Sequence, residues 1–393
     1  METYSLYIHI PFCKKRCPYC DFNTYAGLED KIPDYVAALC KEISLVSSAS
    51  GQRLTAHTIF FGGGTPSLLS PAQFNTIMQQ IITSFDLTPG YEFTLEANPG
   101  TVSLDYLLSI RKIGLNRVSF GMQSANLVDL VLLGRIHDYW DVINAVKWSR
   151  QAGFDQINLD LIFGLPFQTL ERWQQSIELA IGLAPDHFSL YALTVEAATP
   201  LYQWVNRGLV TQPDDDLAAD MYEWASDRLE QAGFQQYEIS NWARRNENGA
   251  VFTCRHNLQY WRNLPYLGFG AGAHGYADGY RLANVPGVSA YINKLNGTQK
   301  VSFPFSPAND QVIKIDIRME MEETMMVGLR LTDEGVSLKD FKTRFGVPVQ
   351  EIFGKEILSL EKTGLLETGD RLRLTKHGRL LGNQVFMRFI SGG

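Results

Sequence analysis

The chain of 393 residues contains little cysteine and no long apolar run, and both shortages exclude whole classes of protein. Five cysteines are too few for a disulfide framework in a chain of this length, so we expect a reducing compartment, the cytoplasm. No apolar run approaches the roughly 20 residues that a membrane-spanning helix needs. The first residues show neither a basic segment nor an apolar core, so we expect no secretory signal.

The chain also lacks an excess of positive charge. With 35 Lys and Arg against 42 Asp and Glu, its formal net charge is −7, which argues against a broad nucleic-acid-binding surface. Basic residues in the last third are diluted by acidic neighbours, as on a solvated helix face. Hydrophobic residues make up 45% of the chain, as in globular proteins with a full core.

Residues 4–195 alternate between short apolar segments and longer amphipathic segments. The apolar segments predict strands at 5–10, 57–61, 91–95, 117–120, 156–161 and 187–191. The amphipathic segments predict helices at 32–48, 71–84, 103–113, 139–152 and 170–183. Alternating strands and helices form a parallel sheet, and six such units are too few for a closed eight-stranded barrel. We therefore predict an α/β fold, an open (β/α)6 partial barrel, with its site at the C-terminal ends of the strands.

The rest of the chain predicts two further parts. Residues 1–200 form the barrel core, and we assign 201–305 to a barrel extension with weak periodicity. Residues 306–393 predict a smaller α+β domain of helices followed by a hairpin. Its turn is Gly369-Asp370, between alternating apolar runs. This order resembles a winged helix.

Three of the five cysteines, Cys13, Cys17 and Cys20, lie within eight residues with C-x3-C-x2-C spacing. Three thiolates are one short of a closed tetrahedral zinc site. They are the number that leaves one iron open in a [4Fe–4S] cluster, which four thiolates otherwise hold. Two alternatives remain on spacing alone: zinc with His9 as a fourth ligand, or a disulfide with one spare thiol.

A glycine-rich turn, FGGGTPS at 61–67, follows the second predicted strand. Its glycines permit close approach to a ligand and leave N–H groups free to donate, although a tight strand-to-helix turn explains the same residues. Four polar side chains then follow successive predicted strands: Glu96, Gln123, Arg135 and Asp160. Such a ring suits a zwitterionic nucleoside, because carboxylates bind ammonium or ribose hydroxyls and Arg binds a carboxylate.

These motifs together resemble the oxygen-independent coproporphyrinogen III oxidase group of the radical S-adenosylmethionine (SAM) family, over essentially the whole chain. The resemblance implies a [4Fe–4S] cluster on Cys13, Cys17 and Cys20. Its open iron is chelated by the amino and carboxylate groups of SAM, and an electron donor reduces it. The SAM contacts that the resemblance implies are Tyr7, Tyr19, Gly63, Gly64, Thr65, Glu96, Gln123, Arg135, Asp160 and Ala192.

Two branches of this group share the fold. The oxidases have a long extension before the cysteine loop and a further cysteine two residues after the third. Here twelve residues precede Cys13, and Phe22 occupies the position of the further cysteine. The chain instead contains RHNLQYW at 255–261, which is similar to the H-N-x-x-Y-W motif of the haem-chaperone branch.

This second resemblance implies that His256 binds haem iron and that Tyr260 and Trp261 offer flat faces to the porphyrin. A hydrogen-bonded surface histidine with two core aromatics is the plainer alternative. Two features stay open: Cys254 has no assigned role, and the glycine-rich stretch 268–274 is either a second close-approach loop or a tight turn.

We therefore expect a cytoplasmic haem chaperone that carries a [4Fe–4S] cluster and SAM and passes haem to an acceptor haemoprotein. The acceptor is unidentified, and membrane-associated haemoproteins are among the candidates. The enzymatic alternative is radical oxidative decarboxylation of the propionate side chains of coproporphyrinogen III. A nucleic-acid-binding winged helix is a third interpretation, but the charge pattern makes us expect no nucleic acid partner.

Overall fold

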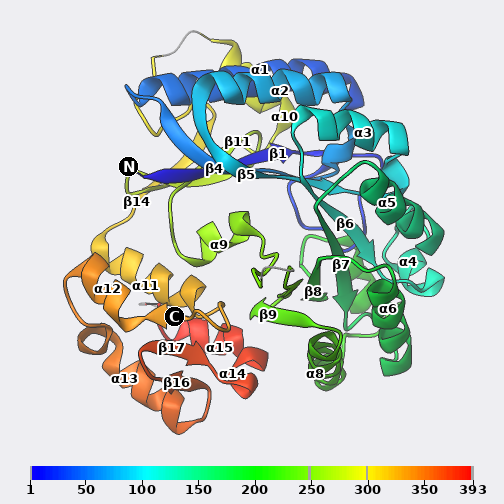
Figure 1. Ribbon diagram of the computed structural model, residues 1–393, viewed down its shortest axis with the longest axis vertical. Coiled ribbons are helices and arrows are strands. Elements are labelled where there is room, and N and C mark those ends of the chain that lie inside the picture. The colour runs from blue at the N-terminus through cyan, green and yellow to red at the C-terminus, as the bar shows by residue number, and fades with distance from the viewer. Residues whose placement is uncertain (1, 247–248, 298–299, 391–393) are drawn as a thin grey trace. The chain divides into compact units, whose positions relative to one another are not determined.

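The computed structural model describes residues 2–246, 249–297 and 300–390. The chain divides into two compact units. Figure 1 colours the ribbon by residue number, so that the segments of each unit can be followed. The first unit is Met1–Ala232 with Pro265–Ile313, and the second is Gly233–Leu264 with Lys314–Gly393. Both units are discontinuous in sequence, unlike the three consecutive ranges predicted above. The predicted ranges 1–200, 201–305 and 306–393 were drawn from consecutive stretches of sequence, and as domains they stay a prediction.

A parallel sheet is the centre of the first unit. Its strands pair in the order β1, β4, β5, β6, β7, β8, each parallel to the next. Their bounds are β1 Thr3–Ile10, β4 Leu54–Gly63, β5 Phe85–Ala97, β6 Arg117–Gln123, β7 Gln156–Phe163 and β8 His187–Ala192. Each predicted strand lies within one of these, which confirms the predicted α/β fold with its parallel sheet.

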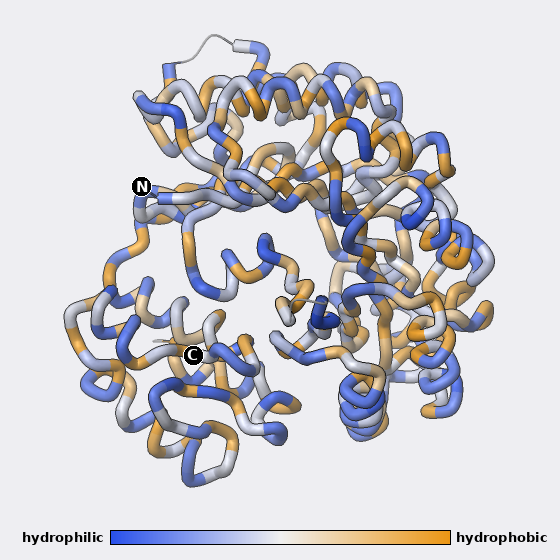
Figure 2. Tube along the Cα trace, viewed as in Figure 1, coloured by the Kyte–Doolittle hydropathy of each residue, from blue (hydrophilic) through white to orange (hydrophobic). Residues whose placement is uncertain are grey.

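Helices connect these strands and cover the outer face of the sheet, as Figure 1 shows for α1, α2, α3, α5 and α6. Hydrophobic and hydrophilic residues are interspersed along these helices (Figure 2), as in helices with one buried face. The helices of this unit are α1 Ile32–Ala49, α2 Pro71–Ser84, α3 Leu104–Ile113, α4 Leu127–Leu132, α5 Tyr139–Gln151, α6 Leu170–Gly182, α7 Pro200–Asn206, α8 Asp215–Gln231 and α10 Val288–Asn296, with 3-10 turns at Glu29–Lys31, Pro66–Leu68 and Pro99–Thr101.

Local sequence sets where these helices begin and end. The Ser70 hydroxyl accepts a hydrogen bond from the Gln73 backbone amide, and the Gln73 side-chain oxygen accepts one from the Ser70 backbone amide, so α2 starts with a capping box. Gly114 ends α3 with φ 115°, a backbone conformation that favours glycine. Between helices and sheet, Phe61, Phe93 and Phe120 are fully buried in the core.

The sheet extends further than predicted. At the edge beyond β1, β11 (Tyr266–Phe269) pairs with β1 in parallel. The antiparallel strands β12 (His274–Ala277) and β13 (Tyr280–Asn284) continue it, followed by β14 (Asn309–Lys314). The predicted barrel extension therefore contributes strands to the same sheet as the barrel core.

The second unit combines a hairpin with a helical module. Strands β9 (Phe234–Glu238) and β10 (Asn241–Arg244) pair antiparallel. Strands β16 and β17 form the predicted hairpin around Gly369, and β15 adds a third strand. The remaining bounds are α9 Arg255–Trp261, α11 Ile317–Gly328, β15 Val336–Ser337, α12 Leu338–Phe345, α13 Val349–Lys362, β16 Leu366–Thr368, β17 Arg371–Leu374, α14 Lys376–Leu380 and α15 Gly382–Met387.

This module has its own core, in which Met325, Leu329, Val349 and Phe353 are almost completely buried. Across the described ranges of both units, no helix has the length and apolar character that crossing a membrane requires.

Candidate cofactor site

The three clustered cysteines lie on one closed loop. Two short strands, β2 (Phe12–Cys13) and β3 (Tyr25–Ala26), pair in parallel at its ends. The Tyr25 amide also donates to the Pro11 carbonyl at 2.7 Å. All five cysteines of the chain are free thiols, so the disulfide alternative is wrong.

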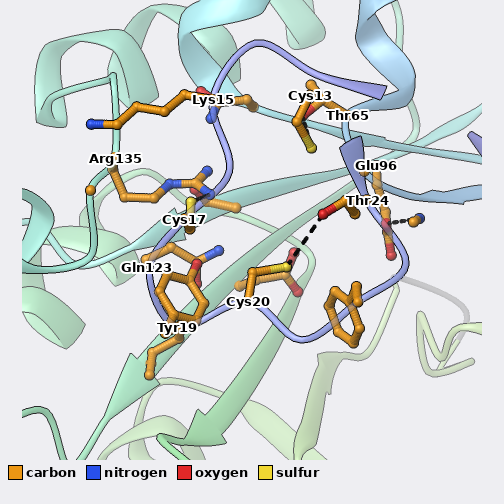
Figure 3. Close-up of a pocket in the computed structure, with 18 of the residues that line it drawn as sticks. Cys13, Lys15, Cys17, Tyr19, Cys20, Thr24, Thr65, Glu96, Gln123 and Arg135 are labelled. Carbon is orange, nitrogen blue, oxygen red and sulfur yellow. Dashed lines mark hydrogen bonds between the residues drawn. The ribbon is translucent and has the colours of Figure 1, made fainter. Parts of the chain in front are cut away.

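This loop borders a cavity of about 430 Å³ together with the ends of strands β4 to β8 (Figure 3). The volume lies within the range of small-molecule sites. Cys13, Cys17 and Cys20 all line it. The cavity also brings together these predicted residues: Tyr19, Gly63, Gly64, Thr65, Glu96, Gln123, Arg135, Asp160 and Ala192.

Each cysteine sulfur has a polar neighbour on the cavity wall (Figure 3). The distances to Sγ are 3.7 Å from Thr65 Oγ1 to Cys13, 3.6 Å from Arg135 Nη1 to Cys17, and 3.9 Å from Thr24 Oγ1 to Cys20. Burial raises the pKa of the Cys13 and Cys20 thiols. A bound metal or cluster reverses this tendency, because it takes the thiolate as its ligand.

His9 is engaged in the protein interior and does not act as a fourth ligand here. Its Nδ1 lies 3.0 Å from the Tyr7 hydroxyl and its Nε2 lies 2.9 Å from the Asn23 carbonyl. The zinc alternative with His9 is therefore wrong. Among the described residues, no group of three or more His, Cys, Asp or Glu side chains is arranged to hold a single metal ion.

Tyr7 is the one predicted SAM residue that does not line the cavity. Its hydroxyl meets His9, and its ring stacks on Phe60 with centroids 6.3 Å apart. A Cβ atom on Gly62 would lie 3.1 Å from the Tyr7 ring. Tyr7 thus packs beneath the glycine turn, and a direct contact with SAM stays a prediction.

The glycine turn is shaped by packing within the protein. The Gly63 amide donates to Glu96 Oε2 at 3.1 Å, and the Gly64 amide donates to the Ile10 carbonyl at 2.9 Å. The prediction that these N–H groups are free for a ligand is therefore wrong. Gly63 has φ 110°, and a Cβ atom there would lie 2.5 Å from the His9 ring, so both backbone and space require glycine.

Two buried carboxyl groups face the cavity. Burial, reinforced by the charge of Asp160, raises the pKa of Glu96 to about 7. Burial also raises the pKa of Asp160, although its carboxylate accepts hydrogen bonds from Ser119 Oγ and Asn158 Nδ2, both at 2.8 Å. A cation or hydroxyl donor in the cavity would stabilise both carboxylates.

Arg135 and Gln123 complete the polar wall. Arg135 Nη2 donates to the Gly121 carbonyl at 2.9 Å, while Nε is buried and has no hydrogen-bond partner among the described residues. A buried donor without a partner is costly, and an anionic ligand would satisfy it. Gln123 has φ 64°, a left-handed conformation that is rare for residues other than glycine. Such local strain is often found at ligand sites.

Several cavity residues were not predicted: Lys14, Lys15, Asn98, Thr101, Ser119, Ile136, Tyr191, Thr194 and Glu196. Most of these residues follow the end of a strand and lie near positions that were predicted. Their position after a strand is therefore the sequence feature that could have identified them as cavity residues. Sequence does not tell which side of a loop faces inward.

The glycine-rich stretch 268–274 is a tight turn that supports the cysteine loop. It contributes no residue to the cavity lining. A Cβ atom on Gly272 would clash with the side-chain Nδ2 atom of Asn23. The same Nδ2 atom donates a hydrogen bond to the Ala271 carbonyl at 3.0 Å. The structure thus decides between the two interpretations of this stretch.

In the second unit, helix α9 places the three predicted haem residues within two turns. His256 is only 1% exposed, and its Nε2 lies 2.7 Å from the Tyr260 hydroxyl. The Arg330 guanidinium lies 4.5 Å above the Trp261 ring, whose buried Nε1 has no hydrogen-bond partner in the described part of the chain. His256 is therefore a buried histidine, not a surface one. Cys254, just before α9, is fully buried as well.

Comparison with known proteins agrees with this geometry. The Radical SAM superfamily matches residues 7–180, and the HemN C-terminal domain matches 318–381. Heme chaperone HemW of Bacillus subtilis (strain 168) is 39% identical over 391 residues, covering 98% of this chain and 99% of that protein. HemW of Lactococcus lactis subsp. lactis (strain IL1403) is 35% identical over 387 residues, covering 98% and 97%.

Among solved structures, coproporphyrinogen III oxidase (HemN) from Escherichia coli superimposes with a TM-score of 0.84. It is 24% identical, and the match covers 99% of this chain and 90% of that one, which shows a shared fold. The identities to HemW over nearly the full length show more than the fold. On these grounds, the chain belongs to the heme chaperone HemW family of the radical SAM superfamily.

Proposed function

We propose that this protein is a haem chaperone that binds haem through α9 and passes it to an acceptor haemoprotein. The observation that carries the proposal is the identity to HemW proteins along nearly the whole chain. His256, Tyr260 and Trp261 on α9 support it, because an imidazole is the usual ligand of haem iron and aromatic faces suit a porphyrin. Membrane-associated haemoproteins are among the candidate acceptors, and we place the protein in the cytoplasm.

The cysteine loop fits a [4Fe–4S] cluster with one open iron. It offers three free thiols around one cavity, and His9 is not available as a fourth ligand. In a cubane cluster each thiolate binds a different iron, so the sulfurs need not converge on one point. We assign Cys13, Cys17 and Cys20 as its ligands. When bound, the cluster supplies the electron that radical SAM chemistry requires.

The remaining cavity walls fit SAM. Arg135 presents a guanidinium whose Nε has no hydrogen-bond partner within residues 2–246, 249–297 and 300–390, which suits the SAM carboxylate. Glu96 and Asp160 are buried carboxyl groups that suit its ammonium group and ribose hydroxyls. Tyr19, Gly63, Gly64, Thr65, Gln123 and Ala192 complete the wall of the proposed site.

Haem binding at α9 requires a local change. His256 Nε2 is hydrogen-bonded to the Tyr260 hydroxyl at 2.7 Å, whereas haem iron would need the lone pair of a ring nitrogen. Release of this hydrogen bond is therefore part of haem uptake. Because a typical hydrogen bond contributes about 1 kcal/mol net, its loss costs roughly fivefold in affinity. Tyr260 thus holds the His256 imidazole in place and also competes with the haem iron for its Nε2 atom.

An anaerobic haem titration of the cluster-reconstituted protein, followed by Soret absorbance, tests the proposal. We expect saturation near one haem per chain. His256→Ala is expected to lose at least tenfold in affinity or to change the spectrum, whereas His377→Ala, an exposed histidine of the same unit, leaves both unchanged. Tyr260→Phe keeps the ring and removes this hydrogen bond to Nε2, so we expect about fivefold tighter binding.

Two outcomes contradict the proposal. Binding that is indifferent to His256 in a folded variant would remove the ligand assignment. Absence of specific haem binding, with decarboxylation of coproporphyrinogen III in the presence of SAM and a reductant, would identify an oxidase instead.

A further inference from the structure

The short helix α4 exposes an apolar face at one edge of the first unit. Leu127, Val128 and Val131 are 64%, 64% and 69% exposed. Spacings of three and four residues place them on one side of the helix, and we call them the α4 face. Single exposed apolar residues are common on protein surfaces, but contiguous ones on one element indicate an interaction site.

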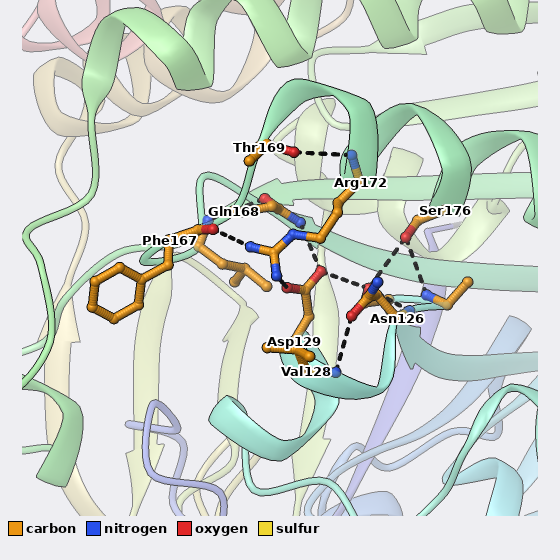
Figure 4. Close-up of polar contacts among 11 residues, drawn as sticks. Asn126, Val128, Asp129, Phe167, Gln168, Thr169, Arg172 and Ser176 are labelled. Carbon is orange, nitrogen blue, oxygen red and sulfur yellow. Dashed lines mark hydrogen bonds and ion pairs between the residues drawn. The ribbon is translucent and has the colours of Figure 1, made fainter.

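The opposite side of α4 is firmly anchored, so its apolar face is not exposed through loose packing (Figure 4). Asp129 is 1% exposed, and its Oδ2 accepts hydrogen bonds from Ser124 Oγ at 2.9 Å and Gln168 Nε2 at 3.3 Å. Its Oδ1 lies 3.5 Å from Arg172 Nη1. A buried carboxylate with several partners fixes the orientation of the helix.

The same network holds an exposed aromatic residue. Arg172, the partner of Asp129, also donates to the carbonyl of Phe167. Phe167 has φ 60° and is 60% exposed, and Figure 4 shows its ring turned away from the network. A left-handed backbone is unfavourable for a bulky residue. The fold therefore keeps this ring at the surface at a cost, as functional sites do.

A basic stretch lies next to α4. Lys14, Lys15 and Arg16 are exposed on the cysteine loop, and none of them forms an ion pair with a carboxylate in the described part of the chain. Asp21 is the only acidic residue of 13–22. A Cβ atom on Gly134, just after α4, would lie 3.9 Å from Lys15 Nζ. The apolar and basic surfaces are therefore neighbours.

The basic stretch borders the cysteine cavity, since Lys14 and Lys15 line it, and so do Gly134 and Ile136, which follow α4 in the chain. We propose that the α4 face, Phe167 and the basic stretch together dock an acidic protein that donates single electrons to the cluster. Local charge complementarity selects the partner: in a chain whose net charge is −7, the exposed Lys14, Lys15 and Arg16 form a basic stretch that attracts an acidic surface. Redox complexes use small interfaces, so a patch of this size suffices.

The inference rests on the proposed function, because the donor serves the cluster. The step transfers one electron and no proton. A donor such as an acidic ferredoxin is oxidised by one electron, and the cluster of this protein is reduced by one. No covalent bond forms or breaks in this encounter.

The test uses a photoreduced acidic [2Fe–2S] ferredoxin as the probe. We compare wild type with Val131→Glu, which adds repulsion to the α4 face, and with Val312→Glu, which adds it to an exposed valine on β14. We expect Val131→Glu to weaken ferredoxin binding at least tenfold and to slow cluster reduction, while Val312→Glu does neither. Dithionite is expected to reduce all three proteins equally.

A second pair tests the charge contribution. Lys14→Glu is expected to weaken ferredoxin binding, and the exposed Lys147→Glu on α5 is not. Raising the salt concentration is expected to remove the difference within this pair, because screening weakens surface charge interactions. Ferredoxin binding is measured on cluster-free protein too, where it reports docking alone.

Other results overturn the proposal. Equal ferredoxin binding by wild type and Val131→Glu would do so. A wild-type dimer that Val131→Glu dissociates would show that the surface joins two copies of this chain. If dithionite reduces no cluster in wild type, the cluster assignment within the proposed function fails, and ferredoxin binding to the cluster-free protein still decides the docking.

Discussion

Glu96 shows at the residue scale how the cavity changes the behaviour of one side chain. Burial and the neighbouring Asp160 raise the pKa of Glu96 from 4.5 to about 7. The folded protein therefore holds this proton more tightly than the unfolded chain does. Between these two values, the folded state binds more protons than the unfolded state. The free energy of unfolding consequently falls as pH rises through this window.

We expect Glu96→Gln to remove this pH dependence. Relative to the variant, cluster-free wild type is expected to lose on the order of 3 kcal/mol of stability between the two pKa values, since one pKa unit corresponds to about 1.4 kcal/mol. Urea unfolding at a series of pH values measures the effect. The exposed Glu223→Gln on α8 is the control and is expected to follow wild type. Parallel profiles for wild type and Glu96→Gln would contradict this account.

At this scale, sequence predicted the cavity residues well, because polar side chains after parallel strands converge on one edge. It failed for interactions between distant residues. Two features of Gly63 depend on contacts across three strands. Gly63 packs against the His9 ring, and its backbone amide donates a hydrogen bond to Glu96. The motif alone gives no sign that these N–H groups already have partners.

At the scale of elements, one side chain of α1 forms hydrogen bonds that hold together the segments beneath the cysteine loop. Glu42 is fully buried and accepts four hydrogen bonds: from the Gly270 amide at 2.9 Å, Asn284 Nδ2 at 2.8 Å, Tyr291 Oη at 2.6 Å and Ser306 Oγ at 2.5 Å. This carboxylate therefore joins α1 to the segment that supports the loop.

We expect Glu42→Ala to lower the free energy of unfolding by about 3–5 kcal/mol, because it leaves buried donors without an acceptor. Glu42→Gln keeps one acceptor oxygen and is expected to cost less than half as much. Urea unfolding of the two variants gives both values. A loss below about 1 kcal/mol in Glu42→Ala would show that water or a rearranged partner replaces the carboxylate.

Among the elements, the predicted strands and helices of the barrel were confirmed, because each spans enough residues to show a period. β11 and α4 were not predicted. A strand of four residues in a glycine-rich stretch, and a helix of six residues in which Asp129 is the one polar side chain, are both too short to show a clear period. β11 is a strand because the edge of β1 offers it partners, and that edge is a property of the folded sheet.

At the scale of the whole molecule, the second unit depends on contacts between two separate stretches of chain. Arg330, on the C-terminal stretch, lies 2.6 Å from Glu238 Oε1 and stacks over Trp261, both on the earlier stretch. The Glu238 side chain is completely buried. Removing one partner of a buried ion pair is strongly destabilising, because the other charge stays buried without compensation.

We expect Arg330→Ala to destabilise the second unit by about 3–5 kcal/mol. The double variant Arg330→Ala with Glu238→Gln is expected to recover part of this loss, since it no longer buries an unpaired charge. Urea unfolding followed by tryptophan fluorescence, which includes Trp242 and Trp261 of this unit, measures both. Equal stability of the single and double variants would exclude the ion pair as the cause.

The interleaving of the two units has a consequence for synthesis on the ribosome. The stretch that carries α9 emerges before the chain that completes its unit, Lys314–Gly393, has been made. Translation proceeds at about 5–20 residues per second, so these residues wait for seconds before their partners exist. A prematurely terminated chain would contain every residue of the proposed haem site on α9 but would lack the part of the unit against which α9 folds. The haem binding that we propose would therefore require that translation be completed.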